Sequence, residues 1–193
     1  MKERIKKILS RREKQDIIVT DGPLVPAAVL LPLYHKEGEY HVLFTKRTEK
    51  VEYHKGQICF PGGARHPEDR SPADTALRET FEEIGIRPED VEVLGELDDM
   101  GTLTSNFLIT PFVALIPYSY EFVVSSDEIE ELIEVPIPAL LDKGCYREEF
   151  YTHQGRPYWS CTYQYKDKVI WGATARILKQ FLDLVFGENK DGR

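Results

Sequence analysis

Long apolar runs, paired cysteines and an excess of basic residues are all missing from this sequence of 193 residues. No apolar run approaches the roughly 20 residues of a membrane-spanning helix, so we expect no membrane partner. The three cysteines include no Cys-x-x-Cys pair, which argues against a disulfide framework or a zinc knuckle and favours a reducing, cytoplasmic location. The formal net charge of −8 argues against nucleic acid as a partner, because a protein that binds its backbone presents a basic surface.

The length suffices for one domain with a sizeable core. Near the N-terminus, Ile5, Ile8 and Leu9 recur at helical spacing, and we expect this apolar face to pack on the domain. We therefore expect three parts: an amphipathic helical extension in residues 1–20, a single domain in residues 21–187 and a flexible tail in residues 188–193.

Strands alternate with a few helices along the predicted domain. Apolar residues in 23–34 and alternating residues in 40–47 predict a hairpin that turns at Gly38. Other segments favour strands at 91–97, 108–117 and 121–124, a short helix at 135–142 and a hairpin at 151–165. A long helix at 171–186 is expected to bury Ile177, Leu178, Phe181, Leu182 and Val185. Strands interspersed with helices predict a mixed sheet covered by helices.

The remaining helix is predicted to begin after Ser71, which can serve as its N-cap, with Pro72 at the first helical position. Gly85 is expected to close it, because glycine readily adopts the left-handed conformation found at helix ends. Its spacing predicts an apolar buried face made of Ala73, Leu77, Phe81 and Ile84.

Three glutamates, Glu79, Glu82 and Glu83, share one face of this helix because their spacing is i, i+3 and i+4. Such an acidic face is most often simply solvated. Clustered carboxylates, however, repel one another and raise each other's pKa unless a cation joins them. Mg²⁺ prefers oxygen ligands and keeps coordination positions for water and substrate phosphate. The cluster therefore predicts a protein that acts on phosphates.

Two segments extend this pattern: residues 60–63 read Phe-Pro-Gly-Gly and residues 78–86 read Arg-Glu-Thr-Phe-Glu-Glu-Ile-Gly-Ile. Together they resemble the signature of the Nudix hydrolases, although Thr80 stands at an aliphatic position. The first half fits only with one inserted residue, so Asp69 or Glu68 would take the early acidic position. The resemblance implies an α+β protein, an α/β/α sandwich with a mixed β-sheet and a loop-helix-loop catalytic motif.

The resemblance also implies catalytic and metal-binding roles. Glu79, Glu82 and Glu83 would be the ligands of Mg²⁺ or Mn²⁺ in a hydrolase that cleaves a nucleoside diphosphate derivative. The general base stays open between these glutamates and a residue on a distant loop. The acidic segment 127–131 is a candidate for such a loop, and within it we single out Glu128.

Other positions of the motif have structural roles by the same resemblance. Arg78 would orient a carboxylate through two parallel hydrogen bonds. Gly62 and Gly63 would permit a tight turn and a close approach of the backbone to the helix, with contact to phosphate as a second role. Gly85 ends the helix.

An upstream segment resembles the coenzyme A (CoA) pyrophosphatase subgroup of this family. Residues 43–48 read Leu-Phe-Thr-Lys-Arg-Thr, at the spacing from the Phe-Pro-Gly-Gly turn that the subgroup keeps. This resemblance makes Arg47 a candidate phosphate ligand. Glu52 replaces the second arginine of the motif, which reverses a charge, and His54 or Lys55 could supply the missing positive charge.

The leading hypothesis is hydrolysis of the diphosphate of CoA or an acyl-CoA, which gives a phosphopantetheine-type product and adenosine 3′,5′-bisphosphate. One alternative is another nucleoside diphosphate derivative, such as ADP-ribose, an ADP-sugar or a dinucleotide. A second alternative is a non-catalytic ligand-binding module of the same fold. In each case the partner is a small molecule. A homodimer is compatible with the sequence, which does not define the oligomeric state.

Overall fold

A computed structural model describes residues 1–17, 23–51, 54–102, 105–153 and 156–187. Its helices are α1 (Lys2–Arg11), α2 (Pro72–Ile84), α3 (Ile137–Leu140), α4 (Gly172–Phe186) and the 3-10 helix η1 (Pro88–Asp90). Its strands are β1 (Asp16–Ile17), β2 (Val25–Lys36), β3 (Glu39–Arg47), β4 (Ile58–Cys59), β5 (Gly62–Ala64), β6 (Glu92–Glu96), β7 (Asp99–Gly101), β8 (Phe107–Leu115), β9 (Ile129–Pro136), β10 (Tyr146–His153), β11 (Arg156–Tyr165) and β12 (Lys168–Ile170).

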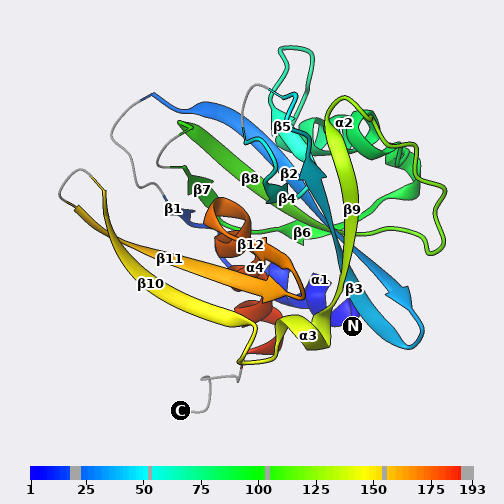
Figure 1. The fold of residues 1–193 in the computed structure, drawn as a ribbon. Coiled ribbons are helices and arrows are strands. Elements are labelled where there is room, and N and C mark those ends of the chain that lie inside the picture. The colour runs from blue at the N-terminus through cyan, green and yellow to red at the C-terminus, as the bar shows by residue number, and fades with distance from the viewer. Residues whose placement is uncertain (18–22, 52–53, 103–104, 154–155, 188–193) are drawn as a thin grey trace.

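These strands form two sheets (Figure 1). The larger sheet has the order β1-β7-β8-β2-β3-β4, and β5, β6 and β9 pair with β2, β8 and β3, respectively. It is mixed, because β2 runs parallel to β8, with Val29 beside Pro111, and antiparallel to β3, with Leu33 beside Val42. The smaller sheet, β10-β11-β12, is antiparallel. The predicted α+β fold with a mixed sheet is confirmed.

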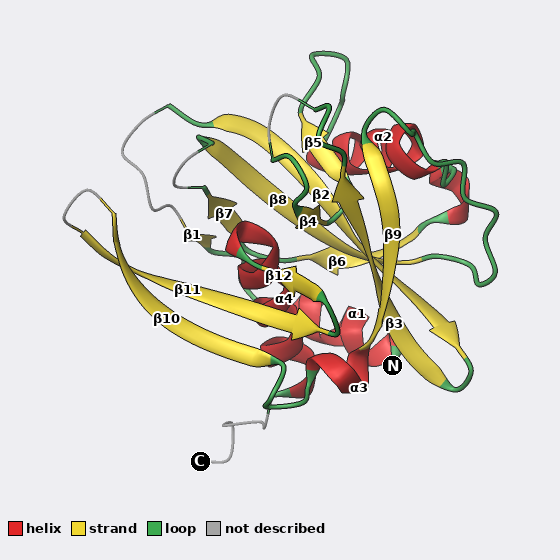
Figure 2. Cartoon of the chain, in the orientation of Figure 1, coloured by secondary structure: helices red, strands yellow, loops and turns green. Residues whose placement is uncertain are grey.

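Strand β2 is buried on both faces, which explains why its sequence is a nearly continuous apolar run. Leu31 and Leu33 belong to one hydrophobic cluster with residues of α1 and α4. Leu30 points to the other face, where it packs in a cluster with Ala76 of α2. The sheet is therefore sandwiched, with α2 on one side and α1 and α4 together on the other (Figure 2).

Helix α2 begins and ends as predicted. The Ser71 hydroxyl accepts a hydrogen bond from Asp74 N at 3.1 Å, and Gly85 has a left-handed φ of 75°. Its predicted apolar face was only partly right: Ile84 is buried and Ala73 packs against the core, but Phe81 is 49% exposed. The helix also buries Thr75, Ala76, Thr80 and Glu83, which were not predicted to be buried. The buried hydroxyls cost little because they are bonded, as when Thr80 Oγ1 donates to Ala76 O at 2.6 Å.

Helix α4 buries all five residues predicted for its apolar face. Helix α1 covers β6, and its Ile5 and Leu9 enter the same hydrophobic cluster as α4. A Cβ on Gly95 would lie 2.6 Å from Leu9 Cβ, so this glycine lets α1 approach the sheet closely. The proposed division into an extension, a domain and a tail stays a prediction, and residues 188–193 lie outside the described part of the chain.

The strand predicted at 121–124 is absent from the structure of that segment. Its backbone pairs with the end of α2 instead: Val123 N donates to Ile84 O at 3.2 Å, and Ser125 N donates to Glu83 O at 2.9 Å. The helix predicted at 135–142 is shortened to α3, because Val135 and Pro136 complete β9. None of the described helices has the length and apolarity needed to cross a membrane.

Candidate active site

The three glutamates of α2 lie in very different surroundings. The side chain of Glu83 is 1% exposed, that of Glu79 is 19% exposed and that of Glu82 is 53% exposed. The exposed fraction of the side chain therefore rises from Glu83 through Glu79 to Glu82, although the three residues share one face of the helix. Only Glu79 of the three lines the large cavity described below.

Glu83 is held by groups from two neighbouring segments. Its Oε1 accepts from Arg47 Nη1 at 2.9 Å, and its Oε2 accepts from Gly62 N at 3.2 Å. Burial nevertheless raises the pKa of Glu83 to about 7, and the nearby carboxylates Glu79 and Glu128 add to this rise. A cation at this position would favour the ionised carboxylate.

Glu79 lies against the Gly62-Gly63 turn. A Cβ on Gly63 would lie 2.5 Å from Glu79 Oε2, so a glycine here lets the carboxylate and the turn approach each other. Burial raises the pKa of Glu79, while its hydrogen bond with Arg78 opposes the rise.

Arg78 anchors the loop before α2. It donates from Nε to Asp69 Oδ1 at 2.9 Å and from Nη2 to Asp69 Oδ2 at 3.0 Å, and it also reaches Glu79 and Glu82 from Nη1. Asp69 is buried and accepts further bonds from His66 N and Thr75 Oγ1. These contacts hold the pKa of Asp69 well below its usual range, with the Arg78 bonds as the main cause. The inserted residue in the motif thus leaves Asp69, rather than Glu68, bonded to the motif arginine.

Glu128 reaches the site from a distant segment. Its side chain is 45% exposed, and its Oε2 lies 3.9 Å from Arg47 Nη2. Its carbonyl accepts from Thr48 N at 2.8 Å, which ties the segment before β9 to the end of β3. The bonds from Val123 and Ser125 to the end of α2 hold the same segment from its other side. Long-range backbone bonds, rather than helical spacing, therefore place Glu128 beside the glutamates of α2.

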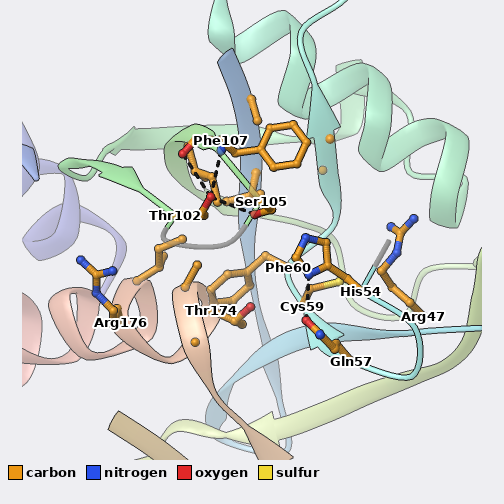
Figure 3. A pocket seen from close by; sticks show the side chains of 18 of the residues that line it. Arg47, His54, Gln57, Cys59, Phe60, Thr102, Ser105, Phe107, Thr174 and Arg176 are labelled. Carbon is orange, nitrogen blue, oxygen red and sulfur yellow. Dashed lines mark hydrogen bonds between the residues drawn. The ribbon is translucent and has the colours of Figure 1, made fainter. Parts of the chain in front are cut away.

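A cavity of about 580 Å³ opens beside these groups (Figure 3). Its charged end includes Arg47, Glu79 and Glu128 together with Gly62 and Gly63. Much of the remaining wall is apolar or aromatic and comes from β2, β4, β8, β11 and the start of α4; it includes Val29, Phe60, Phe107, Ile109, Trp159, Trp171 and Ile177. The cavity thus combines a carboxylate-rich end with an extended apolar surface.

The substrate-binding residues predicted from the motif are only partly brought together. Arg47, Gly62, Gly63 and His54 line the cavity, and His54 Nδ1 lies 2.9 Å from Gln57 Oε1. Lys55 is exposed and does not line it, because it sits in a turn closed by the bond from Gln57 N to His54 O. The expectation that Lys55 supplies charge to the site is therefore not supported. Glu52 lies outside the described residues.

The cavity also contains residues that sequence reasoning did not propose. Thr102 and Ser105 precede β8 and are joined by a 2.8 Å hydrogen bond between their hydroxyls. Arg176 comes from α4. Residues 171–178 also look like the CoA pyrophosphatase subgroup, and this signal could have pointed to α4 as part of the site.

Across the described residues, no group of three or more His, Cys, Asp or Glu side chains is positioned to hold a metal ion as it stands. Arg78 binds Glu79 and Glu82, while Arg47 binds Glu83, so guanidinium groups neutralise the carboxylates. The donor set still fits a hard cation by its chemistry, because carboxylate oxygens gather here and the pKa of two of them is raised.

The mixed sheet between helices and the loop-helix-loop unit of α2 have the arrangement that the Nudix resemblance implied. A family model described as "NUDIX domain" matches residues 23–153. The chain belongs to the Nudix hydrolase family, whose enzymes act on phosphorus anhydrides. Hydrolases of this family generally need a divalent cation, usually Mg²⁺, and bind nucleoside diphosphate substrates.

Two relatives illustrate the likeness. The mouse protein "Peroxisomal coenzyme A diphosphatase NUDT7" is 34% identical over 140 residues, which cover 72% of this chain and 59% of the mouse protein. "Uncharacterized Nudix hydrolase NudL" of Photorhabdus laumondii is 35% identical over 159 residues, which cover 82% of this chain and 84% of that protein. Among solved structures, a Nudix hydrolase from M. smegmatis, RenU, superposes with a TM-score of 0.51 at 20% identity, over 63% of this chain and 83% of that one. This last match supports the fold alone.

Proposed function

We propose that this protein is a divalent-cation-dependent diphosphohydrolase that cleaves CoA or an acyl-CoA into a phosphopantetheine-type product and adenosine 3′,5′-bisphosphate. The observation that supports this most strongly is the shared position of Glu79, Glu128 and Arg47 at one end of a single large cavity, beside the turn of Gly62 and Gly63. Carboxylates and a guanidinium at one end of a partly apolar pocket suit a ligand with an anionic group and an apolar part.

In this proposal Glu79, Glu82 and Glu83 would hold Mg²⁺ or Mn²⁺, and the bound cation would supply positive charge to neutralise the diphosphate. Arg47 positions the Glu83 carboxylate and lies near Glu128. Gly63 leaves room for the Glu79 carboxylate to face the turn.

Glu128 is our candidate for the general base, because it lines the cavity and its carboxylate is partly open to solvent. It would accept at Oε the proton of the attacking water. A new oxygen–phosphorus bond forms as the anhydride oxygen–phosphorus bond breaks, and the second phosphate leaves with that bond's electrons. Glu79, Glu82 and Glu83 are the alternatives for this role.

The CoA substrate is supported by two observations. The mouse relative is named a CoA diphosphatase. The aromatic wall with Phe60, Phe107, Trp159 and Trp171 also gives apolar surface on which a pantetheine or acyl chain can pack. ADP-ribose, an ADP-sugar or a dinucleotide is the alternative substrate, and a non-catalytic binding module is the alternative function. A cytoplasmic location and a homodimer stay predictions; the mouse relative is peroxisomal by name.

A substrate screen tests the proposal. Purified protein with Mg²⁺ or Mn²⁺ is incubated with CoA, an acyl-CoA, dephospho-CoA, ADP-ribose and a dinucleoside polyphosphate, and the products are identified by mass. We expect cleavage of CoA or acyl-CoA at the diphosphate, and loss of this activity in EDTA with an unchanged circular dichroism spectrum. Rapid hydrolysis of ADP-ribose without cleavage of any CoA compound would overturn the CoA substrate. No hydrolysis of any compound would favour the binding module.

A further inference from the structure

Arg176 differs from Arg47, which also lines the cavity, because no described residue neutralises its charge. It lies in the second turn of α4, lines the cavity and is only partly exposed. Within the described part of the chain, its guanidinium makes no hydrogen bond and no ion pair. By contrast, Arg47 is bonded to Glu83. A partly buried guanidinium without an anionic partner is costly, so it indicates a place for an anion.

The electrostatic surroundings of Arg176 also favour a bound anion. Burial lowers its pKa, and the interaction that opposes this comes from Cys161 rather than from a carboxylate. The first turn of α4 lines the same cavity with Gly172, Ala173 and Thr174, and its N-cap Trp171 supplies no side-chain hydrogen bond. The positive end of the helix dipole therefore adds to the charge of Arg176.

Arg176 and the carboxylate-rich end lie apart. Figure 3 shows Arg176 and Arg47 on opposite sides of the view, with Phe60 and His54 between them. A diphosphate bound near Arg47 and Glu79 would therefore not occupy the space beside Arg176. A ligand that places its diphosphate near Arg47 and Glu79 and also binds Arg176 needs a second anionic group, separate from the diphosphate.

We propose that Arg176 binds a phosphomonoester of the substrate that is separate from the diphosphate to be cleaved. The proposal rests on the proposed function and deepens it, because CoA carries such a group at its 3′ position and dephospho-CoA does not. It also assigns to α4 the positive charge that the sequence motif lacks where Glu52 replaces an arginine.

Binding of product-like nucleotides tests this without any need for turnover. Calorimetry compares adenosine 3′,5′-bisphosphate with AMP, which lacks the 3′-phosphate, on the full chain and on Arg176→Gln and Arg176→Lys. Wild type should bind the bisphosphate about 10–100-fold more tightly than AMP, the range of a charge-assisted hydrogen bond to phosphate. Arg176→Gln should remove this preference and leave the affinity for AMP unchanged, while Arg176→Lys should keep part of it.

Lys179→Gln is the matched control, since it removes one positive charge from the same helix at a residue that pairs with Asp183 and does not line the cavity. It should keep the full preference for the bisphosphate. Equal affinities of wild type for the two nucleotides, or a preference that survives in Arg176→Gln, would overturn the assignment of Arg176. An equal loss for both nucleotides in Arg176→Gln would also overturn it, because it would show a general structural role.

Kinetics separate this proposal from the one on which it rests. With CoA and dephospho-CoA as substrates, Arg176→Gln should lower kcat/KM for CoA by about 10–100-fold and change that for dephospho-CoA by less than about threefold. If wild type cleaves neither compound, the CoA hydrolase proposal fails, and the binding comparison still decides whether Arg176 binds a phosphomonoester.

Discussion

Helices α2 and α4 both line the cavity, yet they are built in opposite ways. Helix α4 is held by a continuous apolar face, and all of Ile177, Leu178, Phe181, Leu182 and Val185 are buried. Helix α2 buries one large apolar residue, Ile84, together with small and polar residues and the carboxylate of Glu83, while Phe81 remains 49% exposed. Helix α4 is therefore held mainly by hydrophobic burial, while α2 has fewer large apolar residues buried and includes a buried carboxylate of the proposed site.

The two helices also differ at their N-termini, because α2 has a side-chain cap and α4 does not. Helix α2 is defined by local signals: the Ser71 hydroxyl bonds Asp74 N, and Gly85 terminates the helix in the left-handed conformation. Helix α4 has no side-chain cap at Trp171. Capping hydrogen bonds stabilise α2, which buries few large apolar residues, whereas the packing of its apolar face can hold α4 in place.

The largest expected effect is on turnover, which should depend on a carboxylate of α2 and not on a distant charge of α4. Glu79→Gln keeps the shape of the side chain but removes a carboxylate that faces the cavity, so turnover should fall by about a thousandfold with an unchanged circular dichroism spectrum. Lys179→Gln changes the charge of α4 by one unit away from the cavity and should keep wild-type turnover. The two rates are measured with saturating Mg²⁺. Near-wild-type turnover in Glu79→Gln would remove Glu79 from the proposed machinery.

A second comparison uses the same substitution on each helix. Phe181→Ala empties a fully buried site on α4 and should lower the free energy of unfolding by about 3–5 kcal/mol. Phe81→Ala, on the half-exposed side of α2, should lower it by no more than about 1 kcal/mol. Urea unfolding of both variants measures the difference. Equal losses would contradict the view that α4, and not α2, is held mainly by apolar burial.

The smallest expected effect concerns the buried carboxylate of α2. Burial raises the pKa of Glu83 from 4.5 to about 7, so the folded protein retains a proton there that the unfolded chain has lost. The stabilisation by that proton is complete below about pH 4.5 and is lost as the pH rises through about 7. Between pH 5 and 8, the free energy of unfolding of cation-free wild type should therefore fall by roughly 1–3 kcal/mol relative to Glu83→Gln.

Exposed Glu89 on η1 provides the control for this pH effect, because Glu89→Gln removes a carboxylate that is not buried. The difference in the free energy of unfolding between wild type and Glu89→Gln should stay constant between pH 5 and 8. A pH-independent difference between wild type and Glu83→Gln would mean that the bond with Arg47 keeps Glu83 ionised in the folded protein and outweighs the cost of burial.

Most of the regular elements followed from local patterns. The hairpin of β2 and β3, the ends of α2 and the buried face of α4 were predicted because alternation, capping residues and helical spacing act over a few residues. The burial of α2 was predicted only in part, because Ile84 is buried as expected but Phe81 is not. Helical spacing marks the apolar residues of a face, but bonded threonines and a paired glutamate can replace them when a sheet and a tight turn supply partners.

Sequence alone determined that Glu79, Glu82 and Glu83 share a helix face, that the helix starts at Ser71, and that the chain resembles a Nudix hydrolase. Only the tertiary structure decided that Glu83 is buried against Arg47 and that Glu128 lines the same cavity as Glu79. It also decided that Arg176 lines this cavity without an anionic partner among the described residues. The physical reason is the separation along the sequence of the residues that interact. Spacing along a helix is set by the chain itself, whereas these contacts join residues far apart in the sequence, and their geometry exists only after the sheet and its covering helices have packed.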